Sequence, residues 1–181
     1  QAVYLYASTV GGNVSGGWGA GTEMWANGID FFGSDLPGVD LTGTINIFGS
    51  SSSDSVSLHN RTGSNSVTGK YVINLGDGND NLYKAQLTNA DSVDMGAGDD
   101  YIALKIGPEG TGTPNLASLN MVKLDGGAGS DTLDFMNNPG TSDGTVLELT
   151  AGGAVNFENI VGTATYADVI KGNSSNNILA G

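Results

Sequence analysis

The chain contains no cysteine and only one histidine, His59, among its 181 residues. A disulfide framework, a thiol nucleophile and a zinc site built from cysteine or several histidines are therefore excluded. Basic residues are also scarce, because 6 Lys and Arg face 19 Asp and Glu and leave a net charge of −13. Phosphate would repel such a chain, so we expect no nucleic-acid partner. No apolar run approaches the roughly 18 residues that span a membrane, and we expect no membrane insertion.

Turn-forming residues dominate what is present. Gly, Ser, Thr and Asn make up 80 of the 181 residues, and 15 of the acids are Asp against 4 Glu. This composition disfavours helix interiors and favours turns and strands. Short apolar stretches such as Tyr101–Leu104 and Thr145–Leu149 alternate with polar residues, which is the period-two pattern of strands. We predict an all-β protein, in which the segment Gly21–Phe32 alone has room for a short helix.

The length suits a single domain over residues 1–181. Residues 1–46 are rich in glycine and aromatic residues, whereas a repeat pattern occupies residues 47–181. The sequence starts at Gln1 without a signal peptide and ends at Gly181 inside the pattern. We therefore expect it to be a fragment of a longer chain.

The repeat is clearest in three segments, Leu75–Leu82, Met95–Ile102 and Gly126–Leu133. In each segment an apolar residue lies seven positions before an Asp and another lies two positions after it. The resulting apolar pairs are Ile73/Leu82, Val93/Ile102 and Leu124/Leu133. Weaker copies surround Asp54 and Asp168, and a further copy has Asn177 in place of Asp. The acidic positions are unevenly spaced, which predicts strands or loops inserted between the turns.

These segments resemble the nonapeptide G-G-x-G-x-D-x-U-x of the RTX (repeats-in-toxin) family, in which U is apolar. The resemblance covers residues 70–181 and implies a parallel β-roll in which Ca²⁺ ions lie between stacked turns. In a regular β-roll equivalent turns recur at constant spacing. The uneven spacing here therefore predicts an irregular, calcium-bound parallel β-solenoid or a sandwich-like domain that carries RTX-type turns.

The residue types in the turns suit a hard cation. Glycines permit positive φ and turn backbone carbonyls inward, and an Asp adds a carboxylate at the same point. Oxygen ligands without nitrogen or sulfur favour several Ca²⁺ ions. The alternative is a set of ordinary Asp/Gly turns with solvated carboxylates, but three copies in one register and the net charge of −13 favour calcium. The candidate metal-binding residues are Asp54, Asp77, Gly78, Asp80, Gly98, Asp99, Asp100, Asp125, Gly127, Gly129, Asp131 and Asp168.

Candidate ligand-binding residues lie outside these turns. Trp18 and Trp25 are either core residues or an aromatic wall beside a flexible, glycine-rich loop. Glu109 belongs to the insertion Gly107–Asn115, which is either a surface excursion or a recognition loop. Ser142 lies in a G-x-S-x-G match, but the flanking sequence predicts a turn into a strand rather than the helix of a nucleophile elbow. We therefore expect no enzyme activity.

The resemblance implies a calcium-dependent ligand-binding module of a secreted RTX adhesin, exported by type I secretion to the bacterial cell surface. Such a module would attach to a peptide, protein or glycan on a host or neighbouring cell, as a monomeric unit within a long fibre. Two alternatives remain open. One is a structural segment of a calcium-assembled surface layer or fibre, and the other is the accessory repeat domain of a secreted enzyme.

Overall fold

The computed structural model describes residues 9–10, 14–17, 28–30, 40–41, 44–58, 70–85, 87–104, 121, 123–136, 145–150, 153–164 and 167–181. The elements formed by these residues are all strands, which confirms the prediction of an all-β fold. The helix expected within 21–32 is wrong at Gly28–Asp30, which forms a strand because it pairs with Ser55–Ser57 in a parallel sheet. The remaining residues of that segment lie outside the described part.

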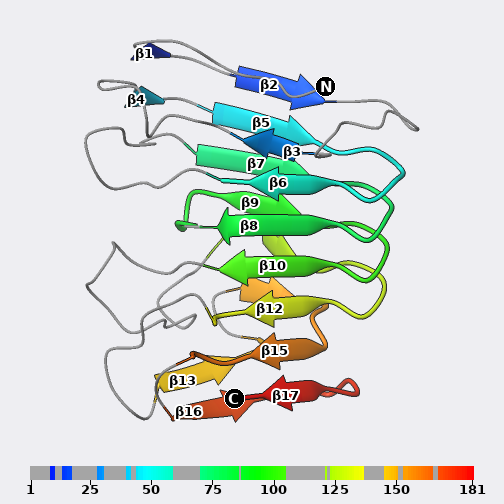
Figure 1. Cartoon of the computed structure of the whole chain (residues 1–181), viewed down its shortest axis with the longest axis vertical. Coiled ribbons are helices and arrows are strands. Elements are labelled where there is room, and N and C mark those ends of the chain that lie inside the picture. Colours follow the sequence, from blue (N-terminus) through cyan, green and yellow to red (C-terminus); the bar gives the residue numbers. More distant parts are fainter. Residues whose placement is uncertain are drawn as a thin grey trace.

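The strands form two large parallel sheets (Figure 1). One sheet has six strands in the order β14-β11-β9-β7-β5-β2 and the other has seven in the order β17-β15-β12-β10-β8-β6-β3. The six-stranded sheet contains β2 (Val14–Gly17), β5 (Thr44–Phe48), β7 (Lys70–Asn74), β9 (Ser92–Asp94), β11 (Lys123–Asp125) and β14 (Ala154–Val155). The seven-stranded sheet contains β3 (Gly28–Asp30), β6 (Ser55–Ser57), β8 (Asn81–Ala85), β10 (Tyr101–Leu104), β12 (Thr132–Asp134), β15 (Asn159–Val161) and β17 (Ile178–Ala180).

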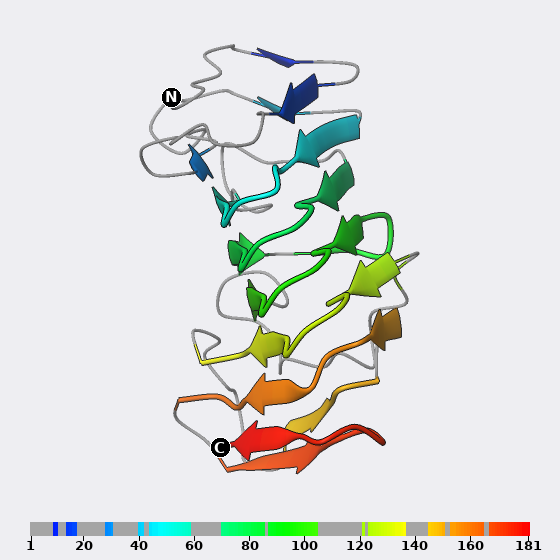
Figure 2. The same ribbon diagram turned by 90° about the vertical axis from the view of Figure 1, so that its right-hand side faces the viewer.

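The chain alternates between these sheets and advances by one strand position in each cycle, as Figure 2 shows from the side. This is the connectivity of a parallel solenoid, because each coil pairs only with the coils before and after it. A sandwich-like arrangement, the other expectation from the sequence, does not fit these parallel ladders. Two further parallel pairs, β1 (Thr9–Val10) with β4 (Asp40–Leu41) and β13 (Thr145–Glu148) with β16 (Asp168–Lys171), complete the described strands.

The core lies between the two sheets and consists of the apolar pairs that the sequence predicts. Ile73 pairs in register with Val93, which pairs with Leu124, in the six-stranded sheet. Leu82, Ile102 and Leu133 form the facing row of the seven-stranded sheet. All six side chains are buried, and complete burial of such a side chain contributes about 1.5–3 kcal/mol. The core therefore holds consecutive coils in one register and fixes where the turns between the sheets stack.

Candidate metal centre at the stacked turns

Four connections from the six-stranded to the seven-stranded sheet have six residues each: 49–54, 75–80, 95–100 and 126–131. With the shorter connection 156–158 they form a stack, here named the turn column, at the right-hand edge of Figure 1. The backbone N–H of Ala97 donates to the Gly76 carbonyl at 2.9 Å, and that of Ala128 donates to the Gly96 carbonyl at 2.8 Å. The stretches of chain that lead from the seven-stranded sheet back to the six-stranded sheet, 58–69, 86–91 and 105–122, differ in length and account for the uneven spacing of the acids.

Glycine is required where consecutive turns touch. Gly98 and Gly129 have φ of 142° and 148°, a region that side-chain-bearing residues rarely adopt. A Cβ on Gly98 would overlap the carbonyl oxygen of Gly78, and a Cβ on Gly129 would overlap that of Gly98. The glycines of the motif thus let the backbone of one turn approach a backbone carbonyl of the preceding turn closely.

The last residues of these turns form a ladder of buried carboxylates. Oδ1 of Asp80 accepts the backbone N–H of Asp54 at 2.7 Å, and Oδ1 of Asp100 accepts that of Asp80 at 2.7 Å. Oδ1 of Asp131 accepts the N–H of Asp100 at 2.8 Å. Each carboxylate therefore reaches back to the preceding turn, and the three pairs are separated by 26, 20 and 31 positions in the sequence. The predicted neighbours, Asp80 with Asp100 and Asp100 with Asp131, are together in the structure.

The second oxygen of each of these carboxylates has no hydrogen-bond partner. Oδ2 of Asp80, Asp100 and Asp131 is buried and receives no hydrogen bond, while the side chains of Asp80 and Asp131 are 0 % exposed. A buried polar atom without a partner is unfavourable, and a buried carboxylate without a counter-charge is more so. Three such oxygens in consecutive turns could be satisfied by a bound proton or by a cation.

Burial also changes the proton affinity of the ladder. Burial raises the pKa of Asp80 and of Asp131 to about 7. The backbone hydrogen bond that each carboxylate accepts lowers its pKa, whereas the neighbouring carboxylates raise it. Burial likewise raises the pKa of Asp100, with the charge of Asp99 acting in the same direction. Without a cation, the folded state thus favours the protonated form of these groups.

A divalent cation with oxygen ligands fits this donor set. Among the described residues, the turn column offers three carboxylate oxygens without a hydrogen-bond partner, together with backbone carbonyls such as those of Gly78 and Gly98. Within the described part of the chain, no three His, Cys, Asp or Glu side chains converge as a metal-binding group. An ion in the turn column would therefore take most of its ligands from the backbone, which calcium accepts readily because it binds carbonyl as well as carboxylate oxygens.

Asp54 differs from the other acids of the turn column. Its Oδ2 accepts the backbone N–H of Ser50 at 2.7 Å and the Ser50 hydroxyl at 3.1 Å, so its carboxylate closes its own turn. Asn177 closes the last described turn in the same way, because its Oδ1 accepts the N–H of Asn173 at 2.9 Å. The structure thus places Asp54 beside the ladder but gives its second oxygen protein partners.

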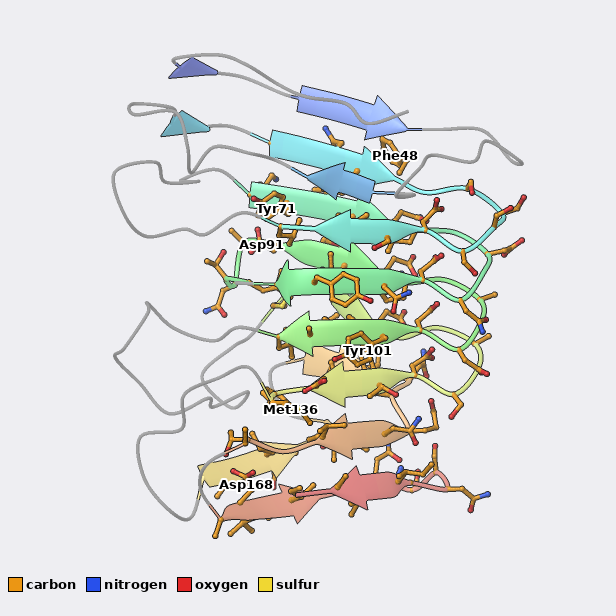
Figure 3. The ribbon with its side chains drawn as sticks, in the orientation of Figure 1. Phe48, Tyr71, Asp91, Tyr101, Met136 and Asp168 are labelled. Carbon is orange, nitrogen blue, oxygen red and sulfur yellow. The ribbon has the colours of Figure 1, made fainter. Side chains whose placement is uncertain are left out.

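Asp168 lies away from the turn column. It begins β16, which follows the seven-stranded sheet, so the connection before it belongs to the opposite side of the solenoid (Figure 3). Its Oδ2 accepts the N–H of Thr163 at 2.6 Å and its Oδ1 accepts the Thr163 hydroxyl at 3.1 Å. The structure does not bring Asp168 together with the predicted ligands.

The remaining candidate acids stand at the rim of the turn column. Oδ1 of Asp99 accepts the N–H of Ser130 at 2.9 Å, as Oδ1 of Asn79 accepts that of Asp99 at 3.0 Å, in a second, exposed ladder. Asp125 accepts the N–H of Gly127 at 3.1 Å, and Asp77 is exposed. These acids add negative charge around the buried ladder, and Asp99 and Asp125 also order the turns.

Glu158 is a member of the ladder that sequence reasoning missed. Its Oε2 accepts the backbone N–H of Asp131 at 3.0 Å. Between each earlier pair of turns, the Oδ1 of an Asp accepts the equivalent N–H. The connection 156–158 is too short to contain the glycine motif, so no repeat marks Glu158 in the sequence. The only local signal is an acid between the apolar residues Phe157 and Ile160.

The candidate ligand-binding residues Trp18, Trp25 and Glu109, the loop 107–115, and His59 and Ser142 all lie outside the described residues. In the described part of the chain, no helix is long and apolar enough to cross a membrane. Comparison with protein-family models, curated proteins and solved structures finds no match to this chain.

The raised pKa values predict how the calcium-free protein responds to pH. A carboxyl group whose pKa is about 7 in the folded protein and 3.8 in the unfolded chain binds its proton more tightly when the protein is folded. Its contribution to stability is therefore lost as the pH rises through about 7. The melting temperature in calcium-depleted buffer should therefore fall as the pH rises from 5 to 8. Thermal melts followed by circular dichroism measure this, and a variant with Asp80→Asn and Asp131→Asn should show a flatter profile. A melting temperature that rises over this range in the parent protein would contradict the prediction.

Proposed function

We propose that this chain is a calcium-binding, RTX-type module of a secreted bacterial adhesin. The observation that carries the proposal is the ladder of buried carboxylates, three of which have one oxygen without a hydrogen-bond partner. The resemblance of the turns to the RTX nonapeptide supplies the identity of the ion and the secreted setting. The net charge of −13 supports a role for divalent cations outside the cell.

The residues proposed to hold calcium are grouped in three consecutive gaps between neighbouring turns. Asp80 and Asp100 flank the first gap, Asp100 and Asp131 the second, and Asp131 and Glu158 the third. Backbone carbonyls of the glycine turns complete each set. Bound calcium would supply the positive charge that the buried carboxylates lack.

Neutralisation of the ladder would couple calcium binding to folding. The ionised carboxylates could then stay buried, and their Oδ1 atoms would continue to accept the amides of the preceding turns. At low calcium inside a cell, the same carboxylates oppose compaction. Folding would be completed after export, since extracellular calcium modules bind at about 10⁻⁴ to 10⁻³ M.

Calorimetric titration with Ca²⁺ tests the proposal. We expect binding between about 0.1 and 1 mM, and its loss in a variant with Asp80→Asn, Asp100→Asn and Asp131→Asn. The carboxamides keep an oxygen that can accept the ladder hydrogen bonds, so this variant removes charge rather than shape. No heat of binding up to about 10 mM Ca²⁺ would refute a calcium module of this class.

Ligand binding by the adhesin is assigned to Trp18 and Trp25, with Glu109 in the loop 107–115. Short peptides and simple sugars, screened with and without calcium, should include a ligand that binds only with calcium and changes Trp fluorescence. Trp18→Ala and Trp25→Ala should each weaken that binding by about tenfold, as truncation of a buried aromatic contact does. Unchanged binding in both variants, together with lower melting temperatures, would place these tryptophans in the core.

A further inference from the structure

The outer face of the seven-stranded sheet carries two tyrosines and a carboxylate on three consecutive strands. Leu82, Ile102 and Leu133 point into the core, so the residues beside them in β8, β10 and β12 face outward. These residues are Tyr83, Tyr101 and Asp134. Figure 3 shows the position of Tyr101 in β10, with Met136 below it after β12. None of them belongs to the turn column.

The two aromatic rings meet at an angle. Their centroids are 5.9 Å apart and their planes are inclined by 53°. Tyr83 is 40 % exposed and Tyr101 is partly exposed. Aromatic faces are electron-rich, so these partly exposed rings offer a surface that attracts cations from solvent.

A nearly buried carboxylate, that of Asp134, is hydrogen-bonded to the hydroxyl of Tyr101. Asp134 is 7 % exposed, and its Oδ2 accepts the hydroxyl of Tyr101 while its Oδ1 accepts the backbone N–H of Met136 at 2.6 Å. The hydrogen bond fixes the Tyr101 ring and adds negative charge next to it.

The basic side chains that the structure describes lie away from this surface, and the side chain of Lys84 in β8 is outside the described part. Lys70 and Lys123 belong to the six-stranded sheet, and Lys123 pairs with Asp94 at 2.5 Å. Lys171 pairs with Glu148 at 2.5 Å. Within the described side chains, the carboxylate of Asp134 receives only the hydrogen bonds from Tyr101 and Met136, and the protein as a whole carries a charge of −13. A cation would therefore complement the negative charge of this surface.

We propose that Tyr83, Tyr101 and Asp134 form a binding site for an arginine side chain of a partner protein. The guanidinium group is planar and weakly hydrated, and it stacks on aromatic faces better than an ammonium group does. One face of it can lie on a tyrosine ring while its charge is held near the carboxylate of Asp134. The site uses none of the residues proposed to bind calcium, so it does not depend on that function.

The test is a titration monitored by two-dimensional NMR of the ¹⁵N-labelled protein in saturating calcium. The probe is acetyl-Gly-Arg-Gly-amide, and its neutral isostere carries citrulline in place of arginine. We expect millimolar binding with shifts centred on β8, β10 and β12, and binding of the citrulline peptide at least about fivefold weaker. Tyr83→Leu should weaken arginine-peptide binding by about two- to fivefold. Asp134→Asn should reduce the preference for arginine over citrulline.

Phe48→Leu is the matched control, because Phe48 is 47 % exposed and lies on the other sheet. It should leave peptide binding unchanged. Tyr83 is exposed enough that its variant should fold, and a circular dichroism melt of each variant verifies folding without reference to calcium binding. Equal binding of the two peptides, or an equal loss with Phe48→Leu, would overturn the proposal. Equally strong binding of choline would also overturn it, since the site would then select a headgroup-like cation rather than arginine.

Discussion

Removal of calcium at pH 8 should lower the melting temperature of this protein by about 15 to 30 °C. Three gaps in the turn column each place ionised carboxylates near a position proposed for one ion. An ion present at 100 times its dissociation constant stabilises a fold by about 2.7 kcal/mol, and 1 kcal/mol corresponds to about 2–4 °C in a chain of this size. Circular dichroism melts with calcium and with a chelator measure the difference.

Magnesium provides the control for this experiment. It requires octahedral geometry and gives up water reluctantly, so it should restore little of the lost stability at the same concentration. Calcium added back to the chelated sample should restore the original melting temperature. A difference of less than about 3 °C between the calcium-loaded and calcium-free protein would show that the turn column is stable without an ion.

Asp100→Asn should have opposite effects on the calcium-free and the calcium-bound protein. The carboxamide retains an oxygen that can accept the N–H of Asp80 but carries no charge. With calcium, loss of an anionic ligand from two gaps should cost about 2–3 kcal/mol. Without calcium at pH 8, removal of a buried carboxylate that lacks a counter-charge should stabilise the fold by about 1 kcal/mol. Urea unfolding at two calcium concentrations measures both effects.

Asp54→Asn is the control for this reversal of sign. The carboxylate of Asp54 accepts two hydrogen bonds from Ser50, so its stabilising role is local. Its substitution should destabilise the protein to a similar extent with and without calcium. If Asp100→Asn behaved in the same way, Asp100 would have a structural role in its turn and no role in binding an ion.

The sequence predicts the stacking of the coils well because apolar spacing and register depend on the same geometry. An apolar residue seven positions before each Asp and another two positions after it must face one core, whatever lies between the turns. Ile73, Val93 and Leu124 accordingly align in one sheet although inserted segments of different length separate them. The pairing of Asp80 with Asp100 and of Asp100 with Asp131 results from that alignment.

The sequence does not predict which side of the solenoid a connection occupies. Asp168 matches the repeat frame once one extra residue is allowed, but the preceding strand belongs to the seven-stranded sheet, so its connection lies on the opposite side. Glu158 reaches the ladder from a short connection that has no glycine motif. For Asp54, by contrast, the sequence itself contains a sign of its different role. Ser50 replaces the second glycine of the motif, and its hydroxyl and amide bind the carboxylate.

The difference between the two sides of the solenoid has a consequence for how such a sequence can diversify. Four connections in the turn column have six residues each, whereas the stretches of chain that return to the six-stranded sheet range in length from 86–91 to 105–122. A length change in one of these turns would remove its Asp from the ladder unless another acid took its place, as Glu158 does in the short connection 156–158. A change in a returning stretch leaves the path of the ladder untouched. Mutation can thus explore new surface segments on one side while selection preserves the other, in the way that antibodies vary their loops on a constant framework.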